Sequence, residues 1–237
     1  MFITTRGIVL RTYPFRDKKL IVKIFTKDDG LVSCVVRRNK SQIILSELLT
    51  IAEITYKKTK NQSLVYIKEC RVDYVYRSLT ISSNKIQCAI MLCEILNKCI
   101  TELNSELYDF VTEAFKWLDS QKSYLVGFDC LFLIRFCQIV GISPLQKDST
   151  SMRNCVLDIS EGRYVDGAFG EGSNFVPNKE SYLIYQLSSM GFSDLKNFNL
   201  KLSVSDEILN YLITYISVHL VDLTKLKSIH ILKELSQ

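Results

Sequence analysis

The period of the hydrophobic pattern changes once along the chain, near residue 78. Before that point, short runs rich in Val, Ile, Thr and Tyr alternate apolar with polar residues, which is typical of half-buried strands. Five such runs cover residues 3–13, 20–26, 31–37, 48–58 and 64–74. Two polar segments between them, KDDG at 27–30 and KTKNQS at 58–63, have the composition of hairpin turns. Five short strands within about 75 residues favour a small closed barrel of the OB type over an open sandwich.

Beyond residue 78, apolar residues recur every three or four positions, as on the buried face of a helix. Helices are predicted over residues 84–101, 104–119, 124–141, 178–189, 205–221 and 225–235. The third is apolar on nearly all sides, which is typical of a helix at the centre of a bundle. Between the third and fourth helices, CVLDISEGRYVDG at 155–167 has the pattern of a short hairpin that turns at 160–162.

The predicted fold class is therefore α+β multidomain. A five-stranded OB-type β-barrel is expected over residues 1–78, followed by an α-helical bundle domain over 79–237 with a hairpin-and-loop insertion at 145–177. The longest apolar stretch contains Asp129 and Arg135, whose charges would be costly in lipid, so we expect no membrane contact. The chain opens without an apolar leader and a small-residue cleavage site, which indicates a cytoplasmic protein.

Catalytic and metal-binding motifs are missing from the sequence. None of the eight cysteines stands in a C-x-x-C pair, and His219 and His230 stand alone in helical patterns. Most of the cysteines lie within apolar runs, as small buried hydrophobes do. The segment GAFGEGSNF at 167–175 lacks the glycine order and the lysine of phosphate-binding loops, so a surface loop is expected. The sequence therefore predicts a non-enzymatic protein without a cofactor.

Charge is divided unevenly along the chain. Residues 1–80 hold 16 Lys and Arg against seven Asp and Glu, whereas the remainder holds 14 against 18. The excess of cations gathers in the loop between strands 1 and 2, at the exit of strand 3 and between strands 4 and 5. OB-folds bind oligonucleotides with the face of strands 2 and 3 and with such loops. The predicted nucleic-acid-binding residues are Arg11, Arg16, Lys18, Lys19, Lys23, Phe25, Arg37, Arg38, Lys40, Lys57, Lys58 and Lys60.

We expect the three basic loops to meet on one rim of the barrel, where phosphate contacts would make binding strongly salt-dependent. Alternation along strand 2 places Leu20, Val22 and Ile24 toward the core and leaves Lys23 and Phe25 on the other face. An exposed Phe25 beside lysines would be a stacking platform for unpaired bases. The alternative is that Phe25 packs against the helical domain.

Three segments carry a resemblance to a known family. GIVLRTYPFRDKKLIVKIFTKDDGLVSCVVRRNKS at 7–41 resembles the N-terminal signature of the RecO family of bacterial recombination mediators. GFDCLFLIRFCQIVGISP at 127–144 resembles the central helix of that family, and LKSIHILKEL at 226–235 resembles its C-terminal helix. The resemblance implies an OB-fold joined to a helical domain, with a nucleoid-associated role in DNA repair and recombination.

The same resemblance implies binding to single- and double-stranded DNA, annealing of complementary strands, and help in loading the RecA recombinase onto DNA covered by single-strand-binding protein. The implied protein partners are RecR and the acidic C-terminal tail of the single-strand-binding protein. For that tail we expect a cation beside an apolar groove of the helical domain. The candidates are Lys98, Lys116, Lys122 and Arg135, although Arg135 is alternatively a structural partner of Asp129.

The chain departs from the family pattern in two places. Many members carry a zinc site of paired cysteines after the Gly-x-x-Pro, whereas this region offers only Cys155. One thiolate cannot make the tetrahedral site that structural zinc needs, so no metal is expected. The exit of strand 3 commonly has a glycine among its basic residues, but here it is RRNKSQ at 37–42, which leaves the local backbone path open.

Two other functions remain compatible with the basic barrel. One is an RNA-binding OB-fold protein, because phosphate contacts do not by themselves distinguish RNA from DNA. The other is an adaptor whose basic barrel binds an acidic protein tail and no nucleic acid.

Overall fold

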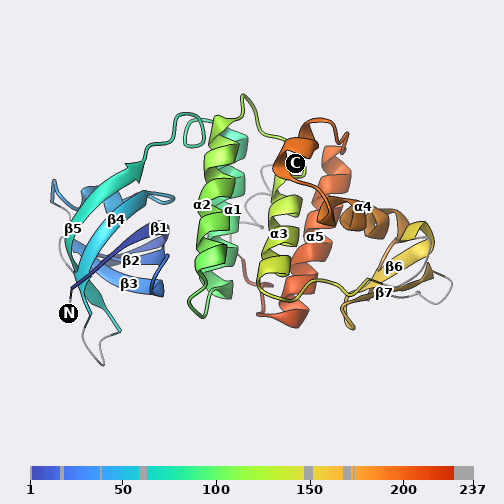
Figure 1. Cartoon of the computed structure of the whole chain (residues 1–237), viewed down its shortest axis with the longest axis horizontal. Coiled ribbons are helices and arrows are strands. Elements are labelled where there is room, and N and C mark those ends of the chain that lie inside the picture. The colour runs from blue at the N-terminus through green and yellow to red at the C-terminus, as the bar shows by residue number, and fades with distance from the viewer. Residues whose placement is uncertain are drawn as a thin grey trace. The chain divides into compact units, whose positions relative to one another are not determined.

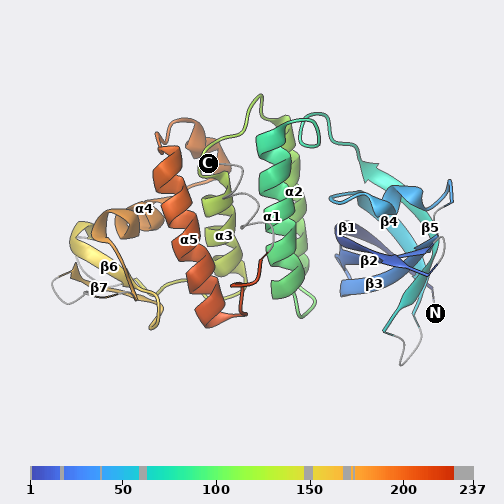
Figure 2. The same cartoon turned by 180° about the vertical axis from the view of Figure 1, so that it is seen from behind.

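A computed structural model describes residues 2–16, 19–37, 39–58, 63–146, 152–167, 172 and 174–226. The chain divides into two compact units (Figures 1 and 2). The barrel unit consists of Met1–Lys122 with Leu226–Gln237, and the helix–sheet unit of Ser123–Lys225. This division groups residues that contact one another most densely, and it falls between Lys122 and Ser123. It does not test the domain boundary predicted near residue 78, which stays a prediction.

Five strands of the barrel unit close into a barrel in the order β1-β2-β3-β5-β4, with β4 paired back onto β1. All neighbours are antiparallel except β3 and β5, which are parallel. This order confirms the predicted OB-type barrel. The strands are β1 (Phe2–Phe15), β2 (Lys19–Thr26), β3 (Gly30–Arg37), β4 (Ile51–Lys57) and β5 (Val65–Tyr74).

The strand β1 is long enough to serve two neighbours. Its first half pairs with β4 and its second half with β2, and the register shifts between Val9 and Arg11. Such a bulge bends a strand and increases its twist, which lets one strand contribute to both sides of a small barrel.

The barrel interior is filled by the alternating apolar residues that the sequence predicted for β2 and its neighbours. Leu20, Val22 and Ile24 are buried in one core cluster with Cys34 of β3 and Tyr56 of β4. Burial raises the pKa of the Cys34 thiol to about 12, only partly opposed by the charge of Lys23. The thiol is therefore protonated at neutral pH and packs as a small hydrophobe.

A side chain completes the seam between β3 and β5. The two strands pair only at Cys34–Val65 and Val35–Tyr66. One step further, the Arg37 amide donates to Gln42 Oε1 at 2.9 Å, and Gln42 Nε2 donates to the Ile67 carbonyl at 2.9 Å. The buried Gln42 amide thus replaces one rung of backbone pairing.

The path of the chain after β3 is set by Asn39. Its Oδ1 accepts from the Gln42 amide at 3.0 Å, and its carbonyl accepts from the Ile43 amide at 2.9 Å. The chain therefore turns directly into the 3-10 helix η1 (Ile43–Ser46), without the glycine common in the family. The side chain of Leu45 on η1 is fully buried in the barrel core.

Two helices follow the barrel in the same unit, α1 (Ser83–Cys99) and α2 (Ser105–Ser120). Asn104 caps α2 by accepting from the Leu107 amide at 2.8 Å. The apolar stripe predicted for α2 is buried, with Val111 and Phe115 fully inaccessible to solvent.

The carboxylate of Asp119, near the end of α2, binds the segment that leaves β5. It accepts from the amides of Arg77, Ser78 and Leu79 at 2.8–3.1 Å and from the Tyr74 hydroxyl at 2.9 Å. Burial by itself raises the pKa of Asp119, but the hydrogen bonds to its charged form outweigh this and lower the pKa below its ordinary value.

Lys85 of α1 is fully buried beside this cluster. Its ammonium donates to Ser78 Oγ at 2.7 Å and to the Gln121 carbonyl. Burial lowers the pKa of Lys85, and the charge of Asp119 opposes that shift. The connection between barrel and helices is therefore held by buried charged groups, whose loss leaves unsatisfied partners.

The helix–sheet unit contains α3, which packs against α4 and α5, and a small sheet ordered β7-β6-β8 that packs against α4. The predicted hairpin is confirmed as β6 and β7. The predicted helix at 225–235 lies almost entirely outside the described residues. Within the described part of the chain, no helix is both long and apolar enough to cross a membrane. The elements are α3 (Phe128–Ile139), η2 (Met152–Asn154), β6 (Cys155–Asp158), β7 (Arg163–Asp166), β8 (Phe175–Val176), α4 (Asn178–Ser188), η4 (Phe192–Lys196) and α5 (Leu202–His219).

Replacement of Gln42 tests its role in the barrel seam. Gln42→Leu leaves the Arg37 amide and the Ile67 carbonyl without partners, so the free energy of unfolding should fall by about 2 kcal/mol. Urea denaturation measures this change. Gln87→Leu is the control, because Gln87 makes only an exposed bond to Ser83 at 3.1 Å. Equal stability of the two variants would contradict the role of Gln42.

Replacement of Asp119 tests the buried cluster and its pH dependence. Asp119→Asn should lower the free energy of unfolding at pH 7 by about 2–3 kcal/mol, because hydrogen bonds to a charge are lost. The folded-state pKa lies below the unfolded value of about 3.9, so this contribution is present above pH ~4 and is lost as the pH falls further.

Stability curves between pH 2 and pH 7 should therefore be flatter for Asp119→Asn than for the wild type. Glu113→Gln, on the exposed side of α2, is the matched control and should change neither value. An acid limb in Asp119→Asn as steep as that of the wild type would argue against this assignment.

Candidate nucleic-acid interface

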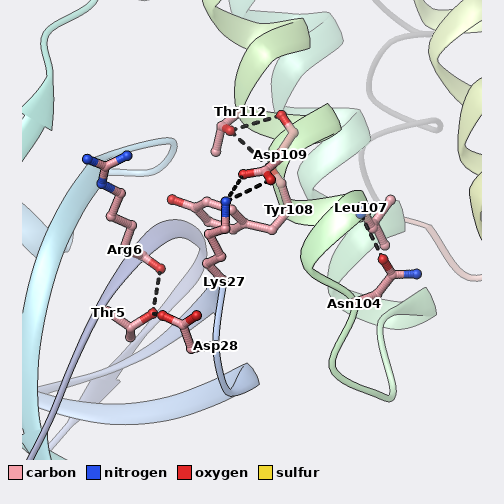
Figure 3. A network of polar contacts seen from close by, with 9 residues as sticks. All are labelled: Thr5, Arg6, Lys27, Asp28, Asn104, Leu107, Tyr108, Asp109 and Thr112. Carbon is pink, nitrogen blue, oxygen red and sulfur yellow. Dashed lines mark hydrogen bonds and ion pairs between the residues drawn. The ribbon is translucent and has the colours of Figure 1, made fainter.

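The β2–β3 turn at residues 27–30 is bonded to other parts of the barrel unit through each of its charged side chains. Figure 3 shows the contacts of two of them, Lys27 and Asp28. Lys27 donates to both carboxylate oxygens of Asp109 on α2 at 2.7 Å. Asp28 accepts from the Thr5 hydroxyl of β1 at 2.6 Å. The turn is therefore occupied by internal contacts, and the charge of Lys27 is compensated by Asp109.

Asp29, the remaining acid of the turn, binds two residues of β4 and its exit. It accepts from the Tyr56 hydroxyl at 2.7 Å and forms an ion pair with Lys58. Hydrogen bonding to Asp29 and burial both raise the pKa of Tyr56, and burial is the larger cause. Lys58, which the sequence assigns to nucleic-acid binding, thus has a carboxylate partner in the barrel itself.

Phe25 is fully buried, which corrects the idea of an exposed stacking platform. Its ring meets the edge of the Tyr108 ring on α2, with the centroids 5.7 Å apart. Phe25 does lie on the outer face of β2, as its alternation predicts, but α2 covers that end of the strand. The alternative, that Phe25 packs against a helix, is the one that the structure supports.

The described cations of the three basic loops do not all lie on one rim, which is a second correction. Lys58 reaches Asp29, next to the start of β3 at Gly30, whereas Arg37 ends β3 seven residues later. At roughly 3.3 Å per residue these positions are about 23 Å apart along the strand. Lys18, Arg38 and Lys60 lie outside the described residues.

The cations at the other end of the barrel share one surface. Directly opposed residues of antiparallel strands lie on the same face of a sheet. The register gives three rows across β1, β2 and β3, namely Phe15–Lys19–Arg37, Tyr13–Ile21–Val35 and Arg11–Lys23–Ser33. We call Arg11, Tyr13, Phe15, Lys19, Lys23 and Arg37 the basic–aromatic face.

The side chains of the basic–aromatic face are accessible, and no carboxylate of the described residues pairs with its cations. Lys19 and Arg37 are exposed, and the other four residues are half-buried. Arg11 lies over the Tyr13 ring at 5.0 Å, and the neighbouring Arg16 lies over the Phe15 ring at 5.9 Å. Among the described residues, no carboxylate forms a salt bridge with these cations or with the exposed Lys40.

The aromatic members of this face, Tyr13 and Phe15, were not among the residues predicted from the sequence. Tyr13 and Phe15 alternate with Arg11 along β1, so the period of two places all three side chains on one side of the strand. That signal was present in RTYPF at 11–15 but was assigned to a basic loop. The face therefore combines cations, which bind phosphates, with rings on which bases can stack.

The four cations expected near a protein-partner groove fall in both units. Lys116 lies over the Tyr74 ring at 5.3 Å, Lys122 is exposed and Lys98 is half-buried. Arg135, in the helix–sheet unit, donates to Gln138 Oε1 at 2.8 Å and to the Met190 carbonyl at 2.6 Å. Arg135 therefore has a structural role, as the alternative supposed. The partners that the described residues provide are Gln138 and Met190, and not the Asp129 that was expected.

The helix–sheet unit also contains an apolar cavity of about 370 Å³ between α3, α5 and the start of β7. Its lining includes Cys137, Leu145, Tyr164, Leu212 and Tyr215, and none of its described lining residues is charged. Over the same described ranges, no three His, Cys, Asp or Glu residues lie together as metal ligands would. The charged surface of the barrel thus remains the better candidate site.

Comparison with known proteins agrees with this arrangement. The family model "Recombination protein O N terminal" matches residues 1–76, and "Recombination protein O C terminal" matches residues 82–228. Proteins named DNA repair protein RecO are similar over 99% of both chains, with 28% identity in Phocaeicola vulgatus, 27% in Porphyromonas gingivalis and 28% in Flavobacterium psychrophilum. The chain therefore belongs to the RecO family and has a role in DNA repair and recombination.

Proposed function

We propose that this chain is a non-enzymatic recombination mediator that binds single-stranded DNA on the basic–aromatic face of its barrel. One observation carries the proposal: Arg11, Lys19, Lys23 and Arg37 share a surface with two aromatic rings, and no described carboxylate pairs with them. A polyanion is the partner whose charge complements such a surface. Lys40 and Arg16 extend the same charge beyond the strands.

Annealing of complementary strands follows from the same contacts. Phosphates held by lysine and arginine release their counterions, and the repulsion between two strands falls where their charge is neutralised. Base identity matters little in this scheme, because phosphates and stacked rings carry little sequence information. Double-stranded DNA would bind through the phosphate contacts alone and more weakly.

Membership of the RecO family supports the protein partners that we include in this proposal. These are RecR and the acidic C-terminal tail of single-strand-binding protein, and the outcome is loading of RecA onto DNA covered by that protein. Lys98, Lys116 and Lys122 are the positions proposed for the acidic tail, whereas Arg135 is a weaker candidate because it bonds to Met190.

The cations of the proposed site can be removed together. The triple variant Lys19→Ala, Lys23→Ala, Arg37→Ala should bind single-stranded DNA more weakly, and the slope of log affinity against log salt should fall by about 2, at roughly 0.7 per phosphate contact. Fluorescence anisotropy with a labelled oligothymidylate at several salt concentrations measures both values.

The charge-matched control for this experiment is the triple variant Arg6→Ala, Arg71→Ala, Arg163→Ala. These three cations have carboxylate partners, namely Asp73, Glu53 and Glu161. If both triple variants weaken binding equally, net charge and not the proposed face is responsible. Competition with an RNA oligomer of the same sequence tests the RNA-binding alternative.

Stacking on Tyr13 is tested separately from charge. Tyr13→Leu should weaken binding by about 1–3 kcal/mol, the contribution of one stacked base, and should leave the salt slope unchanged. Phe25→Leu is the comparison, because Phe25 is buried against Tyr108: it should lower the melting temperature without changing DNA affinity. The opposite outcome, with binding sensitive to Phe25 and not to Tyr13, would return the stacking role to Phe25.

A further inference from the structure

The row of outward-facing residues that contains Tyr13 continues past β3 around the barrel. Val35 is paired with Ile21 on one side and with Tyr66 of β5 on the other. Tyr56 is paired with Ile67, so the next step of this antiparallel ladder sets Lys57 opposite Tyr66.

The row ends on β1, because Lys57 is paired with Phe2. The inward neighbours of these residues, Tyr56 and Ile67, are buried in the barrel core, so Lys57, Tyr66 and Lys68 point outward. In both overall views the N-terminal end of β1 lies beside the lower part of β5 (Figures 1 and 2).

This far side of the barrel has its own cluster of rings and cations. Phe2 and Tyr66 are each 55% exposed, although large aromatic side chains are usually mostly buried in a folded protein. The Lys68 ammonium lies over the Phe2 ring at 5.0 Å, and Lys57 is exposed between the two rings. We call Phe2, Lys57, Tyr66 and Lys68 the distal patch.

We propose that the distal patch is a second contact for single-stranded DNA, and that it takes the continuation of the same strand that binds the basic–aromatic face. The inference rests on the proposed function. From Tyr13 to Phe2 the row crosses five strand-to-strand steps of about 4.8 Å, or roughly 24 Å. A stacked single strand rises about 3.4 Å per nucleotide, so at least about seven nucleotides are needed to span the path, because the strand runs outside the barrel backbone.

Two features favour one continuous strand over a separate ligand. Tyr66 belongs to the distal patch and is also the direct neighbour of Val35, so strand pairing continues along the row, although the Val35 side chain in the middle of it is buried. The distal patch repeats the chemistry of the first face, a cation over a ring, as Arg11 lies over Tyr13. OB-folds that bind single strands occupy roughly 4–16 nucleotides, which leaves room for both contacts.

Among the described residues, Glu69 is an acid beside the distal patch, and its charge would repel a phosphate there. Glu69 pairs with Lys68 at 3.2 Å, with the two side chains 69% and 56% exposed. Exposed pairs of this kind are weak and screened by salt, so a phosphate can displace the carboxylate. Removal of the Glu69 charge should therefore strengthen the contact and not weaken it.

A length series separates the two contacts. Binding of the full chain to oligothymidylates of about 4 to 16 nucleotides is measured by anisotropy for the wild type and for Phe2→Ala with Lys68→Ala. The shortest oligomers should bind both proteins equally. At about 12 nucleotides the double variant should bind about tenfold more weakly, because one stacked base and one phosphate contact are lost.

Two further variants sharpen the result. Ile81→Ala with Arg163→Ala is the matched control, since Ile81 is 82% exposed and Arg163, in the helix–sheet unit, pairs with Glu161 at 3.9 Å. It should follow the wild-type curve at every length. Glu69→Gln should raise affinity for long oligomers at low salt by several-fold and leave short oligomers unaffected.

The inference is overturned if the double variant, with an unchanged melting temperature, follows the wild-type curve at every length or loses affinity equally at every length. It is also overturned if only annealing to a second strand is impaired, because the distal patch would then hold a different strand. If the wild type binds no oligomer at all, or if the Lys19, Lys23, Arg37 variant binds as well as the wild type, the proposed function itself fails.

Discussion

The β2–β3 turn determines which surface of the barrel is available to a partner. Lys27, Asp28 and Asp29 are all used inside the barrel unit, toward α2, β1 and the end of β4. The exposed pair between Lys27 and Asp109 contributes at most about 1 kcal/mol. Complete burial of the Phe25 side chain beside this ion pair contributes more, about 1.5–3 kcal/mol. Apolar packing therefore holds α2 against the barrel, and the Lys27–Asp109 pair sets which residues of the turn and the helix lie opposite each other.

A second buried cluster joins the strands to the helices. Asp119 gathers three successive amides of the segment after β5, and Lys85 lies beneath the same segment. Three adjacent amides form a concave anion site, which a carboxylate of the same chain occupies here. The barrel therefore meets α1 and α2 through fixed polar geometry at one point and through the Phe25–Tyr108 contact at another.

These two attachments explain how one chain separates its charges. Lys27 and Lys58 are paired with acids, whereas no carboxylate in the described part of the chain pairs with the cations at the far ends of β1, β2 and β3. The uncompensated cations stand among rings that strand pairing places on the same face. Such a surface complements a flexible polyanion with stackable bases, whose phosphates can pair with the cations and whose bases can stack on the rings. An acidic protein tail would pair with the cations but would not stack on the rings.

Much of this molecule could be predicted from its residues alone. Alternation in β2, the KDDG turn and the helical spacing of α2 depend on neighbouring residues, so the elements, the OB-type barrel and the basic balance were all visible in the sequence. The period of two also tells which face of a strand a side chain occupies, but not what covers that face. Phe25 and Tyr13 both lie on outer faces, yet Tyr108, some 80 residues away in the chain, covers the first and leaves the second accessible. Likewise Asp29 and Lys58 are far apart in the sequence, and only closure of the barrel places them close enough to form an ion pair. Because of this pair, Lys58 is not one of the cations available to a partner.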